Sequence, residues 1–143
     1  MKRMTILLVM ALVLFAGNAF AADTATVTVN AEVMASCTFD TGVLTLDFGN
    51  LDPAVAGAAA NASGALDFTC AAGTTYSMSA PAADVLTDGT NNINYSITLS
   101  GDVSGTSAGG AQSLTVDADI ASGGFFGLPA GSYADTFTVD LTL

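Results

Sequence analysis

The chain has 143 residues, of which 51% are hydrophobic and only 10% charged, the size of one domain with a sizeable core. It contains thirteen Asp and Glu, no His, and only two basic residues, Lys2 and Arg3. Without His, a Ser-His-Asp or Cys-His nucleophile and a His-ligated metal site are excluded. Without basic residues beyond Arg3, nucleic-acid binding and the usual phosphoryl-transfer clamps are excluded as well. Binding and structural proteins are the main classes that remain.

The first 21 residues have the pattern of a secretory signal peptide. Lys2 and Arg3 form a positive start, an apolar run follows from Ile6 to Ala16, and small residues precede a cleavage point before Ala22. The apolar run would rise only about 16 Å as a helix, which is too short to cross the hydrocarbon core of a bilayer. We expect residues 1–21 to be removed, which changes the net charge from −11 to −13 because Lys2 and Arg3 leave with them.

Apolar and polar residues alternate along seven stretches, which is the period of half-buried β-strands. In chain order these stretches are 26–33, 44–48, 66–70, 76–80, 93–99, 114–120 and 137–143. Turn signals that contain Gly, Asp or Asn separate most of them. Short alternating strands bounded by such turns predict an all-β protein, an antiparallel immunoglobulin-like sandwich.

Two low-complexity stretches lack this alternation. Residues 54–65 are rich in Ala and have no amphipathic period, and residues 104–110 are rich in Ser and Gly. We expect both stretches to be loops, the second of them mobile. No internal repeat or linker divides the chain, so one domain is expected after the signal peptide.

Cys37 and Cys70 are the two cysteines, an even number in a chain that we expect to be secreted. Such a pair predicts one disulfide bond within the domain, formed in an extracellular or periplasmic compartment. A metal site would need more soft ligands than two thiols.

The sandwich predicted from the strand count is incomplete. An immunoglobulin-like sandwich has seven strands, whereas the sequence after Cys37 offers about six, the last from Tyr133 to Leu143. A missing strand exposes an apolar groove and an unpaired edge. The alternating stretch from Ala22 to Glu32 precedes the first cysteine and could fill the groove of a neighbouring molecule.

Carboxylates are the only raw material for catalysis in this sequence. Asp117 and Asp119 share one face of a predicted strand and could form a glycosidase pair, but a solvent-facing polar row explains them better. Tyr133 and Asp135 also share a face, for which a turn-stabilising hydrogen bond is the better explanation. We therefore expect that the protein is not an enzyme.

A group of oxygen-bearing side chains could coordinate Ca²⁺, which prefers carboxylate and amide oxygens. Its members are Asp84, Asp88, Asn91 and Asn92. Their spacing differs from that of an EF-hand loop, so we expect neither a metal ion nor a cofactor.

Five segments, in the family's order, resemble the archaic chaperone–usher pilus subunits, the spore coat protein U domain family. They are TATVTVNAEVMASCTF (24–39), LDFGNLDP (46–53), GALDFTCAAGTTYSMS (64–79), LTDGTNNINYSITLS (86–100) and GSYADTFTVDLTL (131–143). The chain departs from the family in having Val85 where an Arg is frequent, and in lacking a Trp after the Tyr-containing strand.

The resemblance implies assembly by donor-strand exchange. A periplasmic chaperone would lend a strand to the incomplete sandwich of residues 32–143, and an outer-membrane usher would replace it with the N-terminal strand of the next subunit. That donor strand is expected at residues 22–31. The residues expected to face each other are Ala25, Val27, Val29 and Ala31 on the donor and Phe137, Val139 and Leu141 on the receiving edge.

The expected function is that of a structural subunit of a surface pilus or fimbria, secreted through the periplasm, with a role in adhesion and biofilm formation. Its partners would be neighbouring copies or related pilus subunits, besides the chaperone and usher. A stand-alone secreted coat or matrix protein of the same fold is the alternative. A secreted carbohydrate-binding or carbohydrate-active protein is the third possibility.

Overall fold

The computed structural model describes residues 24–143, so the predicted signal peptide lies outside the described residues. The chain divides into two units, Met1–Glu32 and Val33–Leu143. Residues 24–32 form no strand or helix, and the side chains of Val27 and Val29 are exposed. All strands of the described part belong to the second unit.

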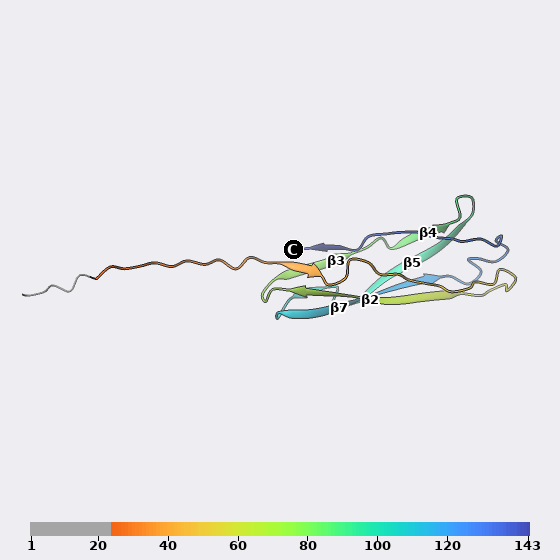
Figure 1. The fold of residues 1–143 in the computed structure, drawn as a ribbon. Coiled ribbons are helices and arrows are strands. Elements are labelled where there is room, and N and C mark those ends of the chain that lie inside the picture. Colours follow the sequence, from red (N-terminus) through yellow and green to blue (C-terminus); the bar gives the residue numbers. More distant parts are fainter. Residues whose placement is uncertain (1–23) are drawn as a thin grey trace, which may run out of the picture. The chain divides into compact units, whose positions relative to one another are not determined.

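Two antiparallel sheets make up the Val33–Leu143 unit (Figure 1). The larger sheet has the strand order β1 (Cys37–Phe39), β2 (Ala60–Cys70), β7 (Gly110–Ile120), β5 (Asn92–Gly101) and β4 (Ala83–Thr87). The smaller sheet has the order β6 (Ser104–Thr106), β3 (Thr75–Ser79) and β8 (Asp140–Thr142). Nowhere between residues 24 and 143 does a helix occur that could cross a membrane. The architecture confirms the predicted all-β, immunoglobulin-like antiparallel class.

The core is built from the alternating faces of the long strands. In β2, β5 and β7 every second side chain is buried, as period-2 patterning requires. The largest fully buried side chains are Phe68, Leu114, Val116 and Ile120. Phe68 also meets Tyr76 of the smaller sheet edge-on, with ring centroids 5.2 Å apart. These aromatic and aliphatic contacts hold the two sheets together.

The structure corrects the expectation that residues 54–65 form a loop, because β2 begins at Ala60. Its Ala- and Gly-rich first half pairs with β7 without interruption, Ala60 opposite Ile120. Strand formation here depends on backbone pairing with a long neighbour rather than on side-chain propensity. Residues 54–59 lie outside any strand, as expected.

The stretch 104–110 was also wrongly expected to be a loop throughout. Ser104–Thr106 forms β6, which pairs with β3, and Gly110 is the first residue of β7. In addition, β4 (Ala83–Thr87) was not predicted, because its burial does not alternate and only its ladder with β5 defines it. Both short strands lie at sheet edges, where sequence patterning is weak.

Two stretches with clear alternation form no ladder over most of their length. Residues 44–48 belong to no strand, and of residues 137–143 only Asp140–Thr142 pair, with β3. Their alternate side chains are nevertheless half-buried against the core. Both segments therefore have the side-chain pattern of strands without strand partners.

Candidate functional site

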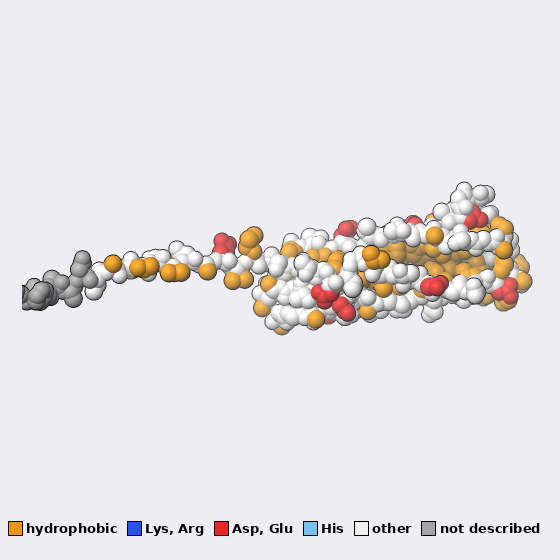
Figure 2. Space-filling model, in the orientation of Figure 1, with side chains coloured by type: hydrophobic (Ala, Val, Ile, Leu, Met, Phe, Trp, Pro, Cys, Tyr) orange, Lys and Arg blue, Asp and Glu red, His pale blue; other side chains and the backbone are white. Residues whose placement is uncertain are grey.

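An apolar groove runs between these two unpaired segments of the Val33–Leu143 unit. Residues 41–48 form one wall and residues 135–139 the other. The floor consists of side chains of the larger sheet, namely Leu66, Leu86, Tyr95, Val116 and Ala118. The hollow has a volume of about 440 Å³, and Figure 2 shows it as an elongated depression lined by hydrophobic side chains.

A second hollow of about 470 Å³ continues the groove. It is lined by residues 45–53 on one side and 128–135 on the other, and it shares Leu46 and Phe48 with the first hollow. The two walls are therefore antiparallel: residues 41–53 run along the groove in one direction, and residues 128–139 run in the other. The walls, residues 41–53 and 128–139, are 13 and 12 residues long, so the groove has the length of one long β-strand.

Both walls present unsatisfied backbone groups. Residues 41–48 and 135–138 make no backbone–backbone hydrogen bond with any other residue of the described chain. A β-strand placed between them would find N–H and C=O groups on either side, and most such groups are paired in folded proteins. The groove is thus the open edge of the sandwich.

The side chains of the walls point alternately into the groove region and outward. Leu44, Leu46 and Phe48 are half-buried, whereas the intervening residues are exposed. On the opposite wall Phe137 and Val139 are half-buried in the same way. This alternation is the sequence signal that identifies both walls, although it does not reveal that they lack partners.

The residues expected at the receiving edge are placed in two different settings. Phe137 and Val139 line the groove. Leu141 instead lies in β8 opposite Met78, where it packs against the core and does not line either hollow.

The expected donor residues lie in the separate unit Met1–Glu32. Ala25, Val27, Val29 and Ala31 are all exposed, at 82% for Val27 and 86% for Val29. This segment has the alternating pattern of a strand but no strand partner among the described residues.

One polar pair lies in the apolar groove. The Tyr95 hydroxyl donates a hydrogen bond to Asp135 Oδ2 at 2.8 Å. Burial raises the pKa of Tyr95 above its usual value, and the hydrogen bond to Asp135 raises it further. The Tyr95 ring also lies between the walls, 6.1 Å from the Phe48 ring and 6.4 Å from the Phe137 ring. Tyr95 therefore links both walls to the floor.

Further contacts fix the start of the C-terminal wall. Ala134 exchanges two backbone hydrogen bonds of 3.1 Å with Thr87, the last residue of β4. The Tyr133 hydroxyl donates to the carbonyl oxygen of Pro129 at 3.1 Å. Tyr133 thus makes a hydrogen bond within its own turn, as the sequence indicated, whereas Asp135 bonds to Tyr95, forty residues away in the chain.

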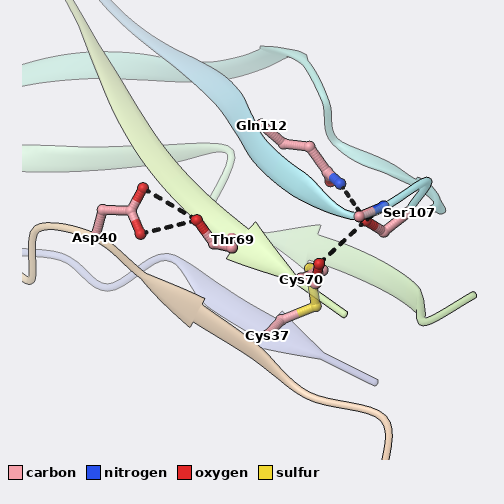
Figure 3. The surroundings of a disulfide bond; sticks show 7 residues. Cys37, Asp40, Thr69, Cys70, Ser107 and Gln112 are labelled. Carbon is pink, nitrogen blue, oxygen red and sulfur yellow. Dashed lines mark hydrogen bonds between the residues drawn. A yellow bond between two sulfur atoms is a disulfide. The ribbon is translucent and has the colours of Figure 1, made fainter. Parts of the chain in front are cut away.

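The predicted disulfide between Cys37 and Cys70 is present and joins β1 to β2 (Figure 3). Beside it, the Thr69 hydroxyl donates to Asp40 Oδ1 at 3.1 Å, which adds a second link, between β2 and the residue that follows β1. Because β1 leads directly into residues 41–48, both links anchor the beginning of that groove wall. A buried Ser107 hydroxyl accepts a hydrogen bond from Gln112 Nε2 on the other side of Cys70.

Asp117 and Asp119 lie away from the groove, on the outer face of the larger sheet. Asp117 is flanked by Ser63 and Thr98 on the neighbouring strands, and Asp119 is exposed. They belong to a polar row on the solvent side of β7, opposite buried Val116 and Ala118. This placement agrees with the preferred interpretation of the sequence.

The oxygen-bearing group near residue 88 has local structural uses. Asp88 Oδ1 accepts hydrogen bonds from the backbone N–H groups of Thr90 and Asn91, and Oδ2 accepts one from Asn91 Nδ2. Asp84 accepts one from the N–H of Val85. Among the residues that the structure describes, no group of three or more His, Cys, Asp or Glu side chains could hold a metal ion.

The fold and the groove together define a class of protein, the incomplete β-sandwich with an open groove as long as a strand. The sequence model of the Spore Coat Protein U domain matches residues 23–92. Over these residues the chain is similar to this family, which is that of the archaic chaperone–usher pilus subunits. Comparison with curated proteins and with solved structures gives no significant match.

The family that the chain resembles gives a coarse functional class. Its members are structural subunits of the pilus or coat type rather than enzymes. Together with the disulfide, this indicates an extracytoplasmic, surface-associated protein. The match ends at Asn92, so the wall 135–139 and the floor residues of β7 lie outside it and are defined by the structure alone.

The sequence predicts only one side of the groove, its C-terminal edge. It contains no signal that assigns residues 41–48 to a wall or Tyr95, Val116 and Ala118 to a floor. These residues come together only in the folded sheet. They are so far apart in the sequence that their spacing does not predict contact between them.

Proposed function

We propose that this protein is a structural subunit of a surface pilus, in which residues 22–31 of one copy fill the groove of the next. The observation that carries the proposal is the pair of unpaired backbone rows on either side of an apolar, strand-length groove. An inserted strand would satisfy both rows and cover the apolar floor at the same time.

The dimensions and chemistry of residues 22–31 support this occupant. The ten residues of the donor are nearly as many as the 12 and 13 residues of the groove walls, and they span about 33 Å when extended. Ala25, Val27, Val29 and Ala31 present small to medium apolar side chains on one face, while Thr26 and Thr28 lie on the other. Each Val that becomes buried stabilises the complex by about 1.5 kcal/mol or more, in addition to the new ladder hydrogen bonds.

The family supports the finer steps of the pathway. A periplasmic chaperone would cover the groove first, an outer-membrane usher would exchange it for the next subunit, and the finished fimbria would serve adhesion and biofilm formation. An open groove needs such protection, because an exposed edge and apolar surface otherwise lead to aggregation.

Substitution of the groove-facing donor residues tests the proposal. Val27→Asp or Val29→Asp should abolish the ladder of multimers that donor-strand exchange produces in SDS gels of unboiled samples. A buried carboxylate without a partner costs several kcal/mol, which exceeds the contribution of the Val that it replaces. Thr26→Asp and Thr28→Asp add the same charge on the outward face and should leave the ladder largely intact. Equal behaviour of both pairs would contradict the proposal.

A stand-alone coat protein that fills its own groove is the second candidate. Only five residues, 32–36, separate residue 31 from Cys37, so a fold-back to the whole groove has little chain to use. A single band in unboiled gels, with Val27 protected from solvent in the monomer, would favour this candidate instead.

A further inference from the structure

The end of the sandwich where the second hollow opens has an exposed apolar surface. Two turns, residues 53–58 and 121–128, form this end and are called the tip below. Gly127 N–H donates to the carbonyl oxygen of Pro53 at 2.9 Å, so the turns are bound to each other. Val55 and Phe126 on the tip are 49% and 53% exposed. Pro53, Phe125 and Leu128 of the same two turns line the second hollow, so this pair of exposed side chains adjoins the groove.

A second exposed apolar pair lies just before the disulfide. Val33 and Met34 are 90% and 79% exposed. They lie within the five-residue connection between the proposed donor strand and Cys37. Such side chains in a connecting segment have no evident role in the subunit that carries them.

The tip and the disulfide lie at opposite ends of the sandwich. Gly123 of the tip donates to the carbonyl oxygen of Ala58, two residues before β2 begins. Cys37 pairs with Cys70, the last residue of β2. A strand of 11 residues separates the two ends by about 35 Å.

The direction of the inserted strand determines which end it leaves. All six strand pairs of the described residues are antiparallel, and the free edge of β8 would receive the donor as the next strand of the smaller sheet. A donor antiparallel to residues 135–143 begins at the disulfide end and leaves the groove at the tip. The opposite direction would bring two disulfide ends together, where the acceptor's own N-terminal segment also departs. Head-to-tail stacking requires the first direction.

From this geometry we infer that the tip is a second contact surface between subunits, and that Val33 and Met34 of the incoming copy dock on Val55 and Phe126. The inference rests on the proposed filling of the groove by residues 22–31. Once Ala31 reaches the end of the groove, the next residues are placed directly over the tip. The contact buries two apolar pairs that are exposed in the single chain and restricts the angle between successive subunits.

Paired cysteines test the contact in the full chain. Met34→Cys combined with Phe126→Cys should give disulfide-linked multimers in boiled, non-reduced gels, and reduction should return them to monomer. Each single variant is the control for unspecific oxidation. Met34→Cys combined with Leu143→Cys reports the opposite direction, because Leu143 follows β8, whose Thr142 lies opposite Ser77 near the disulfide end.

The unboiled gel of the same samples separates this inference from the proposed function. An unboiled ladder with covalent multimers for the 34/126 pair alone supports docking on the tip. An unboiled ladder with covalent multimers for the 34/143 pair alone, or for neither pair, overturns the docking and leaves the filled groove in place. Absence of the unboiled ladder in the unsubstituted chain overturns both.

Discussion

Gly64 of β2 lies beneath the groove wall 41–48, where a larger residue would displace the leucine side chains of the wall. A Cβ atom there would come within 2.7 Å of Leu44 Cδ1 and 3.1 Å of Leu46 Cδ2. The missing side chain lets both leucines seat against the sheet and sets the position of the wall. Gly inside a strand commonly marks such a close approach.

Gly64→Val should therefore lower the free energy of unfolding by about 1–3 kcal/mol, the usual effect of overpacking. Urea denaturation measures the change. Ala65→Val is the matched control, because Ala65 is exposed on the outer face of the same strand and Val favours strands. Gly64→Val with unchanged stability would show that the wall is free to move.

Asp88 is held in its ionised form by the turn around it. Hydrogen bonds from the backbone and side chain of Asn91 and from the backbone of Thr90 lower its pKa from 3.8 to about 2. The stability that these bonds contribute is thus complete above about pH 4 and is lost as the pH falls through 2. Carboxyl-carbon NMR should place the midpoint of Asp88 near 2. Asn91→Ala should raise it, whereas Thr90→Ala, which keeps the backbone donor, should not.

At the scale of elements, β1 is a strand of three residues that owes its position to the bonds around it. The Cys37–Cys70 disulfide and the Asp40–Thr69 hydrogen bond join it to β2. Three residues of edge ladder are too few to hold a strand by themselves. The disulfide therefore positions both β1 and the groove wall that follows it.

Replacing both cysteines by Ala should lower the free energy of unfolding by about 4 kcal/mol in the loop-entropy model for a separation of 33 residues. Hydrogen exchange should rise first at Thr38 and Phe39, which lose their fixed position against β2. Thermal unfolding monitored by circular dichroism measures the loss. Unchanged stability together with unchanged exchange at β1 would show that the ladder suffices.

The sequence predicts a strand correctly where side-chain alternation and backbone pairing occur together. The cores of β3, β5 and β7 combine period-2 alternation with a partner on each side, so that side-chain pattern and backbone pairing agree. Where only one of these two features is present, the strand predicted from the sequence differs from the strand in the structure. The first half of β2 has pairing without pattern, and residues 44–48 have pattern without pairing.

At the scale of the whole molecule, charge acts between copies rather than within the core. Beyond Arg3 the chain carries thirteen Asp and Glu side chains and no Lys or Arg, so the fibres that we propose should repel each other. The screening length falls from about 30 Å at 0.01 M salt to about 8 Å at 0.15 M. Lateral bundling should therefore rise with ionic strength, which light scattering measures. Asp117→Asn with Asp119→Asn, on the outer face of β7, should shift bundling to lower salt. Scattering that stays flat across this range would contradict the charge argument.

The sequence by itself determined the all-β class, the disulfide and the lack of His and, beyond Arg3, of basic side chains. These properties follow from the composition and from the alternation of apolar and polar residues, which can be read from residues that are close in the sequence. The groove was decided by the tertiary structure. Its walls, residues 41–48 and 135–139, are about ninety residues apart and become a site only because β2, β5 and β7 place a common floor beneath them. Whether an alternating segment has a partner depends on sheet order, which side-chain period does not encode.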